Sequence, residues 1–264
     1  MTEYLGKSFE EFTRMILPSM EGVIEAAGIS GIPDGSTLRK FRKRLDTDIL
    51  DKVVAYQSTM IVGTSGLTVS MDATGFSASR ASRYYITRLK YFGAEKKTIR
   101  GFTKVSLAVC VDTKAILAVD AVDSRTADVK RAEHIVDGLA EPGYTIEYVL
   151  ADKGYDSERV HEMISERLGA RSLIPARDDG DTPIHRMHGA NRKNMRRELV
   201  EGSEKMEIYH KRALSETVNS VIKTVFGEVL NGRNEETRRS ETMFRCIAYN
   251  FRAGLNLSSS GMVA

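Results

Sequence analysis

The chain has 264 residues, of which 41% are hydrophobic and 28% are charged, and its formal net charge is +3. This composition is typical of a soluble globular protein that can bury a sizeable core. The charge is too small to indicate a dedicated nucleic-acid module, and no apolar run is long enough to span a membrane. The two cysteines lie in apolar surroundings far apart in the sequence and give no disulfide framework, which fits a reduced, cytoplasmic location.

Residues 1–62 are predicted to form a small helical region. Residues 8–11 have the form of a capping box, so we expect a helix to begin there and run to about Ala27, with a kink near Pro18. A later helical pattern runs to about Met60.

Between these two helices lies a strongly basic helical pattern, for which Ser36 or Thr37 is the expected cap. Leu38, Phe41 and Leu45 follow one another at helical spacing, so we expect them to face inward. The other positions are basic: Arg39, Lys40, Arg42, Lys43 and Arg44. A phosphate-binding surface and an ordinary solvated helix both fit this pattern.

After a hinge-like segment at 63–66, the pattern changes from helices to strands. Residues 63–255 are predicted to form the main domain, followed by a loose tail at 256–264. Three leading strands, then helix, strand, helix and strand, describe a mixed sheet with helices packed on it, which is an α/β fold. The expected strands are 67–77, 102–111, 116–122, 145–151 and 171–176, and the helices between them are 129–139 and 157–168.

Asp72 lies inside the first apolar run, on a strand that is expected to be central. A buried carboxylate there is costly unless it is paired or bound to a metal ion. The alternative is an aspartate on the solvent face, because Ser70 and Thr74 share its alternation.

Asp152 ends the apolar run 146–152 and precedes Gly154. Ligand sites in α/β sheets favour the carboxyl ends of strands, and a glycine allows close approach of a phosphate or metal. The alternative is a turn or cap aspartate, a role for which Asp156 competes.

A third acidic residue, Glu216, belongs to a helix expected from about Tyr209 to Phe226. Tyr209, Arg212, Glu216 and Lys223 fall in one stripe roughly 60° wide on that helix. The apolar residues Leu214, Val218, Val221, Ile222 and Val225 fall on the opposite side. A solvated face with an Arg–Glu pair at i, i+4 is the alternative to a functional stripe.

Taken together, these motifs resemble a class of insertion-sequence DDE transposases. The spacing of Tyr209, Arg212, Glu216 and Lys223 matches the Y-R-E-K signature of that class. Asp72-Ala-Thr-Gly resembles its first-aspartate motif, and Asp152-Lys-Gly-Tyr resembles its second. The segment 124–128 is similar to the conserved segment between them. The resemblance covers roughly residues 34–253.

The resemblance implies a ribonuclease-H-like catalytic domain that cleaves DNA and transfers the cut strand. Asp72, Asp152 and Glu216 would be catalytic and would hold two Mg²⁺ ions, or Mn²⁺ in their place. The implied partner is double-stranded DNA, as element ends and as target, bound by a homodimer on paired ends.

The resemblance associates Tyr209 and Lys223 with the handling of transposon-end DNA. Arg212 is suited to a bidentate grip on phosphate, although a structural ion pair with Glu216 is its alternative role. Two basic patches are further candidates for phosphate contacts: Arg39, Lys40, Arg42 and Lys43 in the first, and Arg192, Lys193, Arg196 and Arg197 in the second.

Two other functions stay open. One is a metal-dependent nuclease on the same fold that cuts without strand transfer. The other is a DNA-binding regulator descended from a transposase that has lost catalysis. Asp120 is the reserve candidate for the first aspartate.

Overall fold

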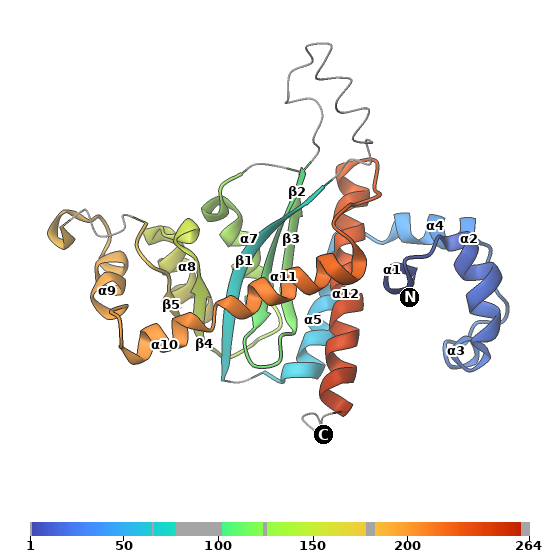
Figure 1. The fold of residues 1–264 in the computed structure, drawn as a ribbon, viewed down its shortest axis with the longest axis horizontal. Helices are drawn as coiled ribbons and strands as arrows, with labels where there is room; N and C mark the ends of the chain where they lie inside the picture. The colour runs from blue at the N-terminus through green and yellow to red at the C-terminus, as the bar shows by residue number, and fades with distance from the viewer. Residues whose placement is uncertain (1, 65, 78–101, 124–125, 178–182, 260–264) are drawn as a thin grey trace, which may run out of the picture.

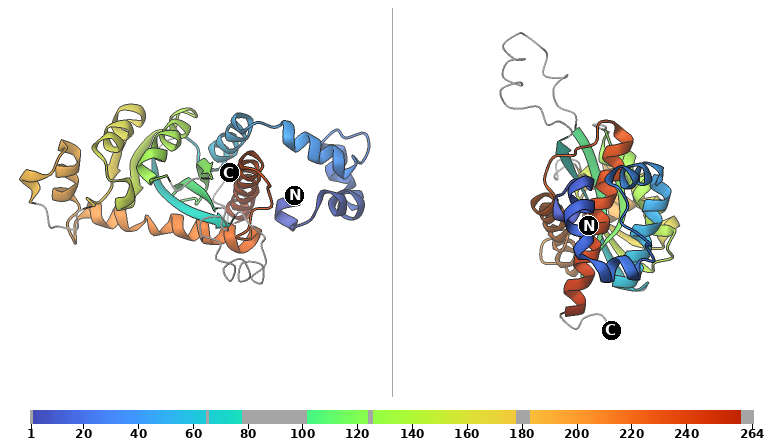
Figure 2. Two further views of the ribbon diagram at one scale, coloured as in Figure 1. Left: turned by 90° about the horizontal axis from the view of Figure 1, so that it is seen from above. Right: turned by 90° about the vertical axis from the view of Figure 1, so that its right-hand side faces the viewer.

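The computed structural model describes residues 2–64, 66–77, 102–123, 126–177 and 183–259. These residues form a mixed β-sheet with helices on both faces, and a group of short N-terminal helices extends from one side (Figures 1 and 2). Residues 124 and 125 of the motif segment 124–128 lie outside the described residues.

The sheet in the described residues has five strands in the order β3-β2-β1-β4-β5. β1 and β3 pair antiparallel with β2, whereas β4 pairs parallel with both β1 and β5. The predicted α/β fold is therefore confirmed, and the mixed sheet flanked by helices fits a ribonuclease-H-like core. The strands are β1 (Leu67–Ser77), β2 (Phe102–Cys110), β3 (Ile116–Val122), β4 (Ile146–Ala151) and β5 (Arg171–Leu173).

Two apolar layers cover the sheet, because alternate side chains of each strand point to opposite faces. On one face, Val69 and Met71 pack with apolar residues of α7 and α8. On the other face, Leu107 and Val109 pack with α5, α11 and α12. The bounds of these helices are α5 (Thr47–Val62), α7 (Asp128–Ala140), α8 (Glu158–Leu168), α11 (Ala213–Phe226) and α12 (Glu235–Ser259).

The N-terminal helices follow the predicted order with two differences. The capping box at Ser8 and Glu11 is present, but the expected long helix breaks into shorter turns around Pro18. The basic helix begins after Asp34, whose carboxylate accepts the Ser36 backbone N–H, so the predicted caps at Ser36 and Thr37 are wrong. The helices are α1 (Thr2–Leu5), α2 (Phe9–Glu11), α3 (Glu21–Ala26) and α4 (Gly35–Arg44).

Helix α5 belongs to the core of the sheet rather than to the N-terminal region with which the sequence pattern groups it. Leu50 and Val54 of α5 are buried in the layer that covers β3. The hydroxyl groups of Ser58 and Tyr144 lie 2.6 Å apart and tie the helix to the loop before β4. Residues of α5 therefore contribute to the packed core that covers the sheet.

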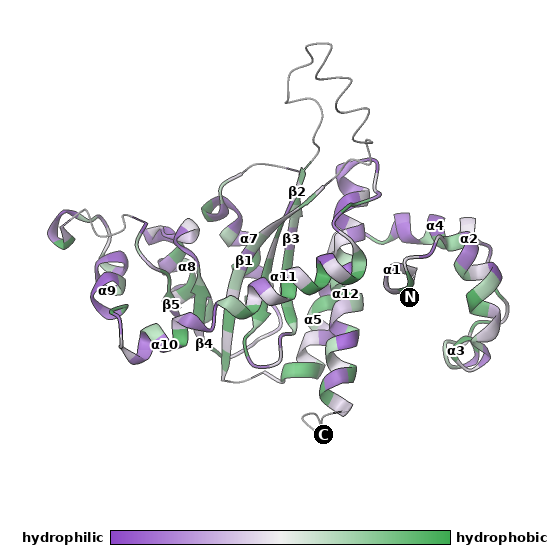
Figure 3. Ribbon diagram, in the orientation of Figure 1, coloured by the Kyte–Doolittle hydropathy of each residue, from purple (hydrophilic) through white to green (hydrophobic). Residues whose placement is uncertain are grey.

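The C-terminal helices also differ from the prediction at their ends. Backbone N–H groups of Arg212 and Leu214 bond three residues back, so the helix expected from about Tyr209 divides into α10 and α11. Helix α12 continues to Ser259, into the segment expected to be a loose tail. Hydrophobic residues concentrate on the strands and hydrophilic ones on α9 (Figure 3). The remaining helices are α9 (Ala190–Glu198) and α10 (Glu204–His210).

Both cysteines, Cys110 and Cys246, are buried free thiols, as expected. Among the described residues, no helix is both long and apolar enough to cross a membrane.

Candidate active site

The register of the sheet brings Asp72 and Asp152 side by side. β1 and β4 are parallel neighbours, and Met71 pairs with Ala151. Each aspartate is the next residue along its strand, and paired strands lie only about 4.8 Å apart. Two carboxylates that are 80 residues apart in the sequence therefore meet at the carboxyl end of β4, where α/β sheets usually bind ligands.

Both aspartates belong to the face that α10 and α11 cover. The side chain of Asp72 accepts a hydrogen bond from Asn219 of α11. Leu150, two residues before Asp152, packs with Ile208 of α10 and Leu214 of α11. Because strand residues alternate between faces, Asp152 follows Leu150 onto the same side.

Asp72 lies in surroundings that favour a bound cation. Burial raises the pKa of its carboxyl group, and the neighbouring negative charge of Asp152 raises it further. Hydrogen bonds from Ala73 and Asn219 and the positive charge of Arg212 lower it, but the net pKa stays above its ordinary value. A divalent cation between the carboxylates would remove both the repulsion and the cost of burial.

The turn after β4 fixes the position of Asp152. Its Oδ1 accepts the backbone N–H of Gly154 at 2.7 Å and caps the short 3₁₀ turn Lys153–Tyr155. A Cβ atom on Gly154 would lie 2.7 Å from that oxygen and 3.1 Å from Oδ2 of Asp128. A side chain at this position would displace the Asp152 carboxylate, so the glycine of the second motif leaves room for it.

Asp156 stabilises the same turn, and its side chain is fully buried. Arg192 donates to both of its oxygens, at 2.7 and 2.5 Å. The Arg177 backbone N–H donates to Oδ2, and the Arg177 guanidinium donates to the carbonyl of Gly154. Arg192, which we predicted to contact DNA, thus has a buried carboxylate as its partner and anchors α9 to this turn.

Glu216 does not join the two aspartates. Its side chain is 58% exposed and its Oε1 accepts a hydrogen bond from Arg212 at 2.8 Å. Within the part of the chain that the structure describes, no three side chains of His, Cys, Asp or Glu are grouped closely enough to hold one metal ion. The predicted Arg–Glu pair is therefore present, and in this arrangement the Glu216 carboxylate bonds Arg212.

Arg212 nevertheless lies among the acidic groups of the site. Burial alone would lower the pKa of its guanidinium, but Tyr209, Glu216 and Asp72 raise it above its ordinary value. Burial also raises the pKa of the Tyr209 phenol; Arg212 lowers it, and the charges of Asp152 and Glu216 raise it. Three of the predicted residues, Tyr209, Glu216 and Asp72, therefore lie close enough to Arg212 to act on its charge.

Helix α11 lies along β1 through polar contacts that the sequence analysis did not identify. The Ser70 hydroxyl donates to Ser215 at 3.0 Å, and the Asn219 amide donates to Asp72 at 2.8 Å. Further along, the Lys223 ammonium lies 5.5 Å from the centre of the Phe76 ring. Three positions four residues apart, 215, 219 and 223, therefore face β1. A polar serine and asparagine at this spacing among apolar residues were the signal in the sequence.

The first basic patch is partly neutralised within the N-terminal region. Arg39 bonds Glu10 at 3.0 Å, and both side chains remain about half exposed. Arg42 pairs with Glu3 at 2.5 Å and lies 4.9 Å from the ring centre of Phe244. Phe41 is 57% exposed, so its predicted inward orientation is wrong. The predicted phosphate ligands on the open face of α4 are Lys40 and Lys43.

The second basic patch also contains both exposed and partly buried side chains. Arg197 is exposed and bonds Asn194, whereas Arg196 lies 3.6 Å from the sulfur of Met187. Lys193 is half-buried.

Asp120, the reserve candidate, belongs to the opposite face of the sheet. It pairs in register with Ser106, whereas Asp72 pairs with Leu107, so their side chains point to different sides. Arg131 of α7 holds its carboxylate through two hydrogen bonds of 2.5 Å. Asp120 therefore cannot replace Asp72.

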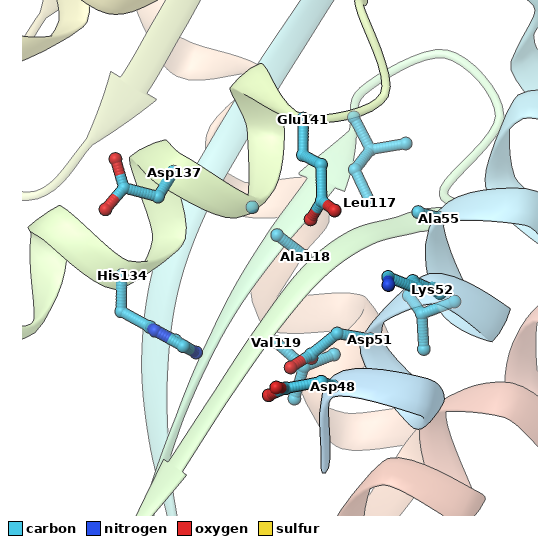
Figure 4. A pocket seen from close by; sticks show the side chains of 12 residues that line it. Asp48, Asp51, Lys52, Ala55, Leu117, Ala118, Val119, His134, Asp137 and Glu141 are labelled. Carbon is cyan, nitrogen blue, oxygen red and sulfur yellow. The ribbon is translucent and has the colours of Figure 1, made fainter. Parts of the chain in front are cut away.

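A cavity of about 310 Å³ lies elsewhere, between α5, β3 and α7. Acidic side chains from both sides surround it, among them Asp48, Asp51 and Glu141 (Figure 4). Burial raises the pKa of Asp51, and the positive charges of His134 and Arg239 lower it in part. Neither Asp72 nor Asp152 lines this cavity.

No curated protein matches the sequence. The Drosophila P element transposase strand transfer complex, a solved structure, superposes with a TM-score of 0.32 and 12% sequence identity. The superposition covers 92% of this chain and 62% of that chain, so this chain spans less than two thirds of that protein.

The family model described as "Transposase DDE domain" matches residues 64–251, which is most of the chain. The match includes the whole sheet and helix α11, and with them the three acidic residues of the predicted site. Transposase DDE domains generally use divalent metal ions, and the oxygen donors of Asp72 and Asp152 suit such ions. The chain belongs to the transposase DDE domain family.

Proposed function

We propose that the protein is a transposase that cuts the ends of an insertion element and joins them to target DNA. The observation that supports this most directly is the parallel register of β1 and β4, which pairs Met71 with Ala151 and so brings the next residues, Asp72 and Asp152, close together in a chain of this family. Paired carboxylates on rigid strands are suited to the precise placement of divalent ions.

In this proposal Asp72 and Asp152 bind two Mg²⁺ ions, or Mn²⁺ in their place, and Glu216 completes the set. When bound, the ions would activate the attacking hydroxyl and stabilise the departing 3′ oxygen. Glu216 needs to leave Arg212 and rotate toward Asp72. Its high exposure and the flexibility of its side chain make that rotation inexpensive, because exposed ion pairs contribute only about 0–1 kcal/mol.

When Glu216 rotates away, the Arg212 guanidinium would bind a DNA phosphate in place of the Glu216 carboxylate. Its guanidinium bonds Glu216 and lies near Asp72, and a DNA phosphate presents the same charge and geometry. Tyr209 and Lys223 flank it on the same side of the sheet, and we assign them to the DNA ends.

The DNA partner is double-stranded, and the phosphate contacts come from two surfaces. Lys40 and Lys43 extend from α4, together with Arg39, and Lys193, Arg196 and Arg197 extend from α9. We leave out Arg42 and Arg192, because both have buried or half-buried intramolecular partners. Function on paired ends would require a homodimer, in the cytoplasm.

The test is Mg²⁺-dependent cleavage of DNA that contains the element's terminal inverted repeats, followed by joining of a pre-cleaved end. Wild-type protein should do both. Asp72→Ala, Asp152→Ala and Glu216→Gln should each abolish both reactions and leave DNA binding intact. Full activity in any of these variants would contradict the assignment.

The same assay separates the two alternatives. Cleavage without joining would identify a nuclease on this fold. DNA binding with neither reaction would identify a regulator, in which the Arg212–Glu216 pair is the resting state of a site that never assembles.

A further inference from the structure

Asn219 occupies a buried position on α11 and is bonded to Asp72. The residue is 6% exposed, and it lies one turn from Ser215 and beside Val218 and Ile222, which are buried as well. Its Nδ2 donates to Oδ2 of Asp72 at 2.8 Å. Its Oδ1 accepts no hydrogen bond from the described residues. The bond to Asp72 is therefore the contact that holds the amide in this orientation.

An amide in an apolar helix face is costly unless it serves a polar partner, since an unbonded buried amide costs about 1–3 kcal/mol in proteins. A leucine would fill this position in a helix that only packed against the sheet. The amide also has no charge. A lysine or arginine here would neutralise Asp72 and compete with a cation, whereas an amide orients the carboxylate and leaves its charge available.

We propose that Asn219 is a positioning residue that holds Asp72 in the orientation needed to share a divalent ion with Asp152. This inference rests on the proposed function, because it assumes that the two aspartates bind metal. Asn219 donates to one carboxylate oxygen, Oδ2 of Asp72, and so restricts the rotation of that carboxylate. Asn219 itself does not contact the reacting atoms.

Asn219 also connects Asp72 on β1 with α11, the helix that carries Glu216. Asn219 is three residues after Glu216 on α11, so its bond to Asp72 fixes the height of α11 along β1 at the turn that holds Glu216. The hydrogen bond between Ser70 and Ser215 fixes the adjacent turn. Loss of the Asn219 bond should therefore loosen both Asp72 and the approach of Glu216.

The test is Mn²⁺ binding by the purified full-length chain without DNA, measured by calorimetry. Asn219→Leu keeps the side-chain size and removes the donor, and it should weaken Mn²⁺ binding about 10–100-fold, as is usual for partners that orient metal ligands. Asn219→Gln keeps an amide donor and should recover part of the affinity. Thr217→Ala changes an exposed position of the same helix, where the hydroxyl bonds only the Ala213 carbonyl, and should bind Mn²⁺ as wild type does. Circular dichroism and urea unfolding check that each variant is folded, and Asn219→Ala replaces Asn219→Leu if the latter does not fold.

A folded Asn219→Leu or Asn219→Ala protein with wild-type Mn²⁺ affinity would overturn the positioning role. The proposed function fails in a different way: Asp72→Ala and Asp152→Ala would then bind Mn²⁺ as tightly as wild type, or the wild-type protein would bind none. The latter results would overturn the metal site and the role of Asn219 together.

Discussion

Asp156 belongs to the second-aspartate motif but has a structural role, because its carboxylate stabilises the turn that follows Asp152. Burial would raise the pKa of this carboxyl, but the nearby His161 ring, the two hydrogen bonds from Arg192 and the Arg177 backbone N–H hold it well below its ordinary value. The same contacts close the turn that presents Asp152. Asp156, which the sequence analysis considers as a cap, instead pairs with Arg192 of α9.

Replacement of Asp156 by alanine should cost about 3 kcal/mol of unfolding free energy, because it removes a buried carboxylate that accepts hydrogen bonds from Arg192 and from the Arg177 backbone N–H. Urea unfolding at neutral pH measures this loss. Asp137→Ala breaks the exposed pair with Arg167 and is the control, for which no change in the midpoint is expected. An Asp156→Ala midpoint equal to that of wild type would contradict the assigned role.

The same variant has a defined pH dependence. A carboxyl with a lowered folded-state pKa stabilises the protein fully above its unfolded-state pKa of about 3.9 and loses that contribution as the pH falls toward the folded-state value. The difference between wild type and Asp156→Ala should therefore be largest at neutral pH and should shrink below about pH 4. A difference that grows on acidification would have the wrong sign.

At the residue scale, the sequence predicted the positions that bear charge but not the groups that hold them. Asp72 and Asp152 could be identified because each occupies a distinctive place in an apolar run. The spacing of Ser215 and Asn219 marks polar positions on an apolar helix face, but it does not identify their partners on β1, Ser70 and Asp72. The Asp156–Arg192 pair joins residues 36 apart and was equally invisible.

At the scale of elements, α4 is the instructive error. Its helical period was correct, but Phe41 faces solvent and Arg42 faces inward. Arg42 gains an ion pair with Glu3 and lies over the rings of Phe9 and Phe244, partners from three other segments of the chain. A hydrophobicity pattern cannot foresee an inward arginine whose partners are this remote.

This orientation predicts different effects for neighbouring basic residues of α4. The double substitution of Lys40 and Lys43 by alanine should weaken binding to any double-stranded DNA and reduce the salt dependence of log K by about 0.9 for each phosphate that is no longer neutralised. Arg42→Ala should leave that slope unchanged and destabilise the protein by about 1–2 kcal/mol. DNA titrations at several salt concentrations, with urea unfolding alongside, measure both effects. An unchanged slope in the double variant would remove α4 from the DNA interface.

The junction of α10 and α11 also differs from the predicted structure. The stripe of Tyr209, Arg212 and Glu216 was derived for one continuous helix, but the backbone tightens at Lys211 and Arg212. Arg212 still reaches Glu216, because both belong to the α11 end of that junction. The identity of the helix was therefore predictable, and its internal break was not.

For the whole molecule, the order of elements was sufficient to predict a mixed sheet with helices on both faces. The order did not predict the pairing, because β1 lies between β2 and β4 only after α7 has crossed the sheet. That pairing sets the register of Met71 and Ala151 and so brings the two aspartates together. The order of elements also did not show that α5, which the sequence pattern groups with the N-terminal region, contributes Leu50 and Val54 to the core.

The molecule has two acidic regions that differ in their suitability as a metal site. Asp72 and Asp152 are neighbours on parallel strands, within the region that matches the family model. The cavity between α5 and α7 is also acidic, through Asp48 and Asp51, but α5 lies outside the matched residues. We therefore expect a metal ion to bind between Asp72 and Asp152 rather than in the cavity.

The most direct measurement is a crystal structure of the protein soaked with Mn²⁺, with anomalous scattering used to locate the ions. We predict a manganese peak between the carboxylates of Asp72 and Asp152, with Glu216 turned away from Arg212 toward it. Saturating Mn²⁺ that leaves these carboxylates without an ion, or that gathers only at the cavity of Asp48 and Asp51, would contradict the account.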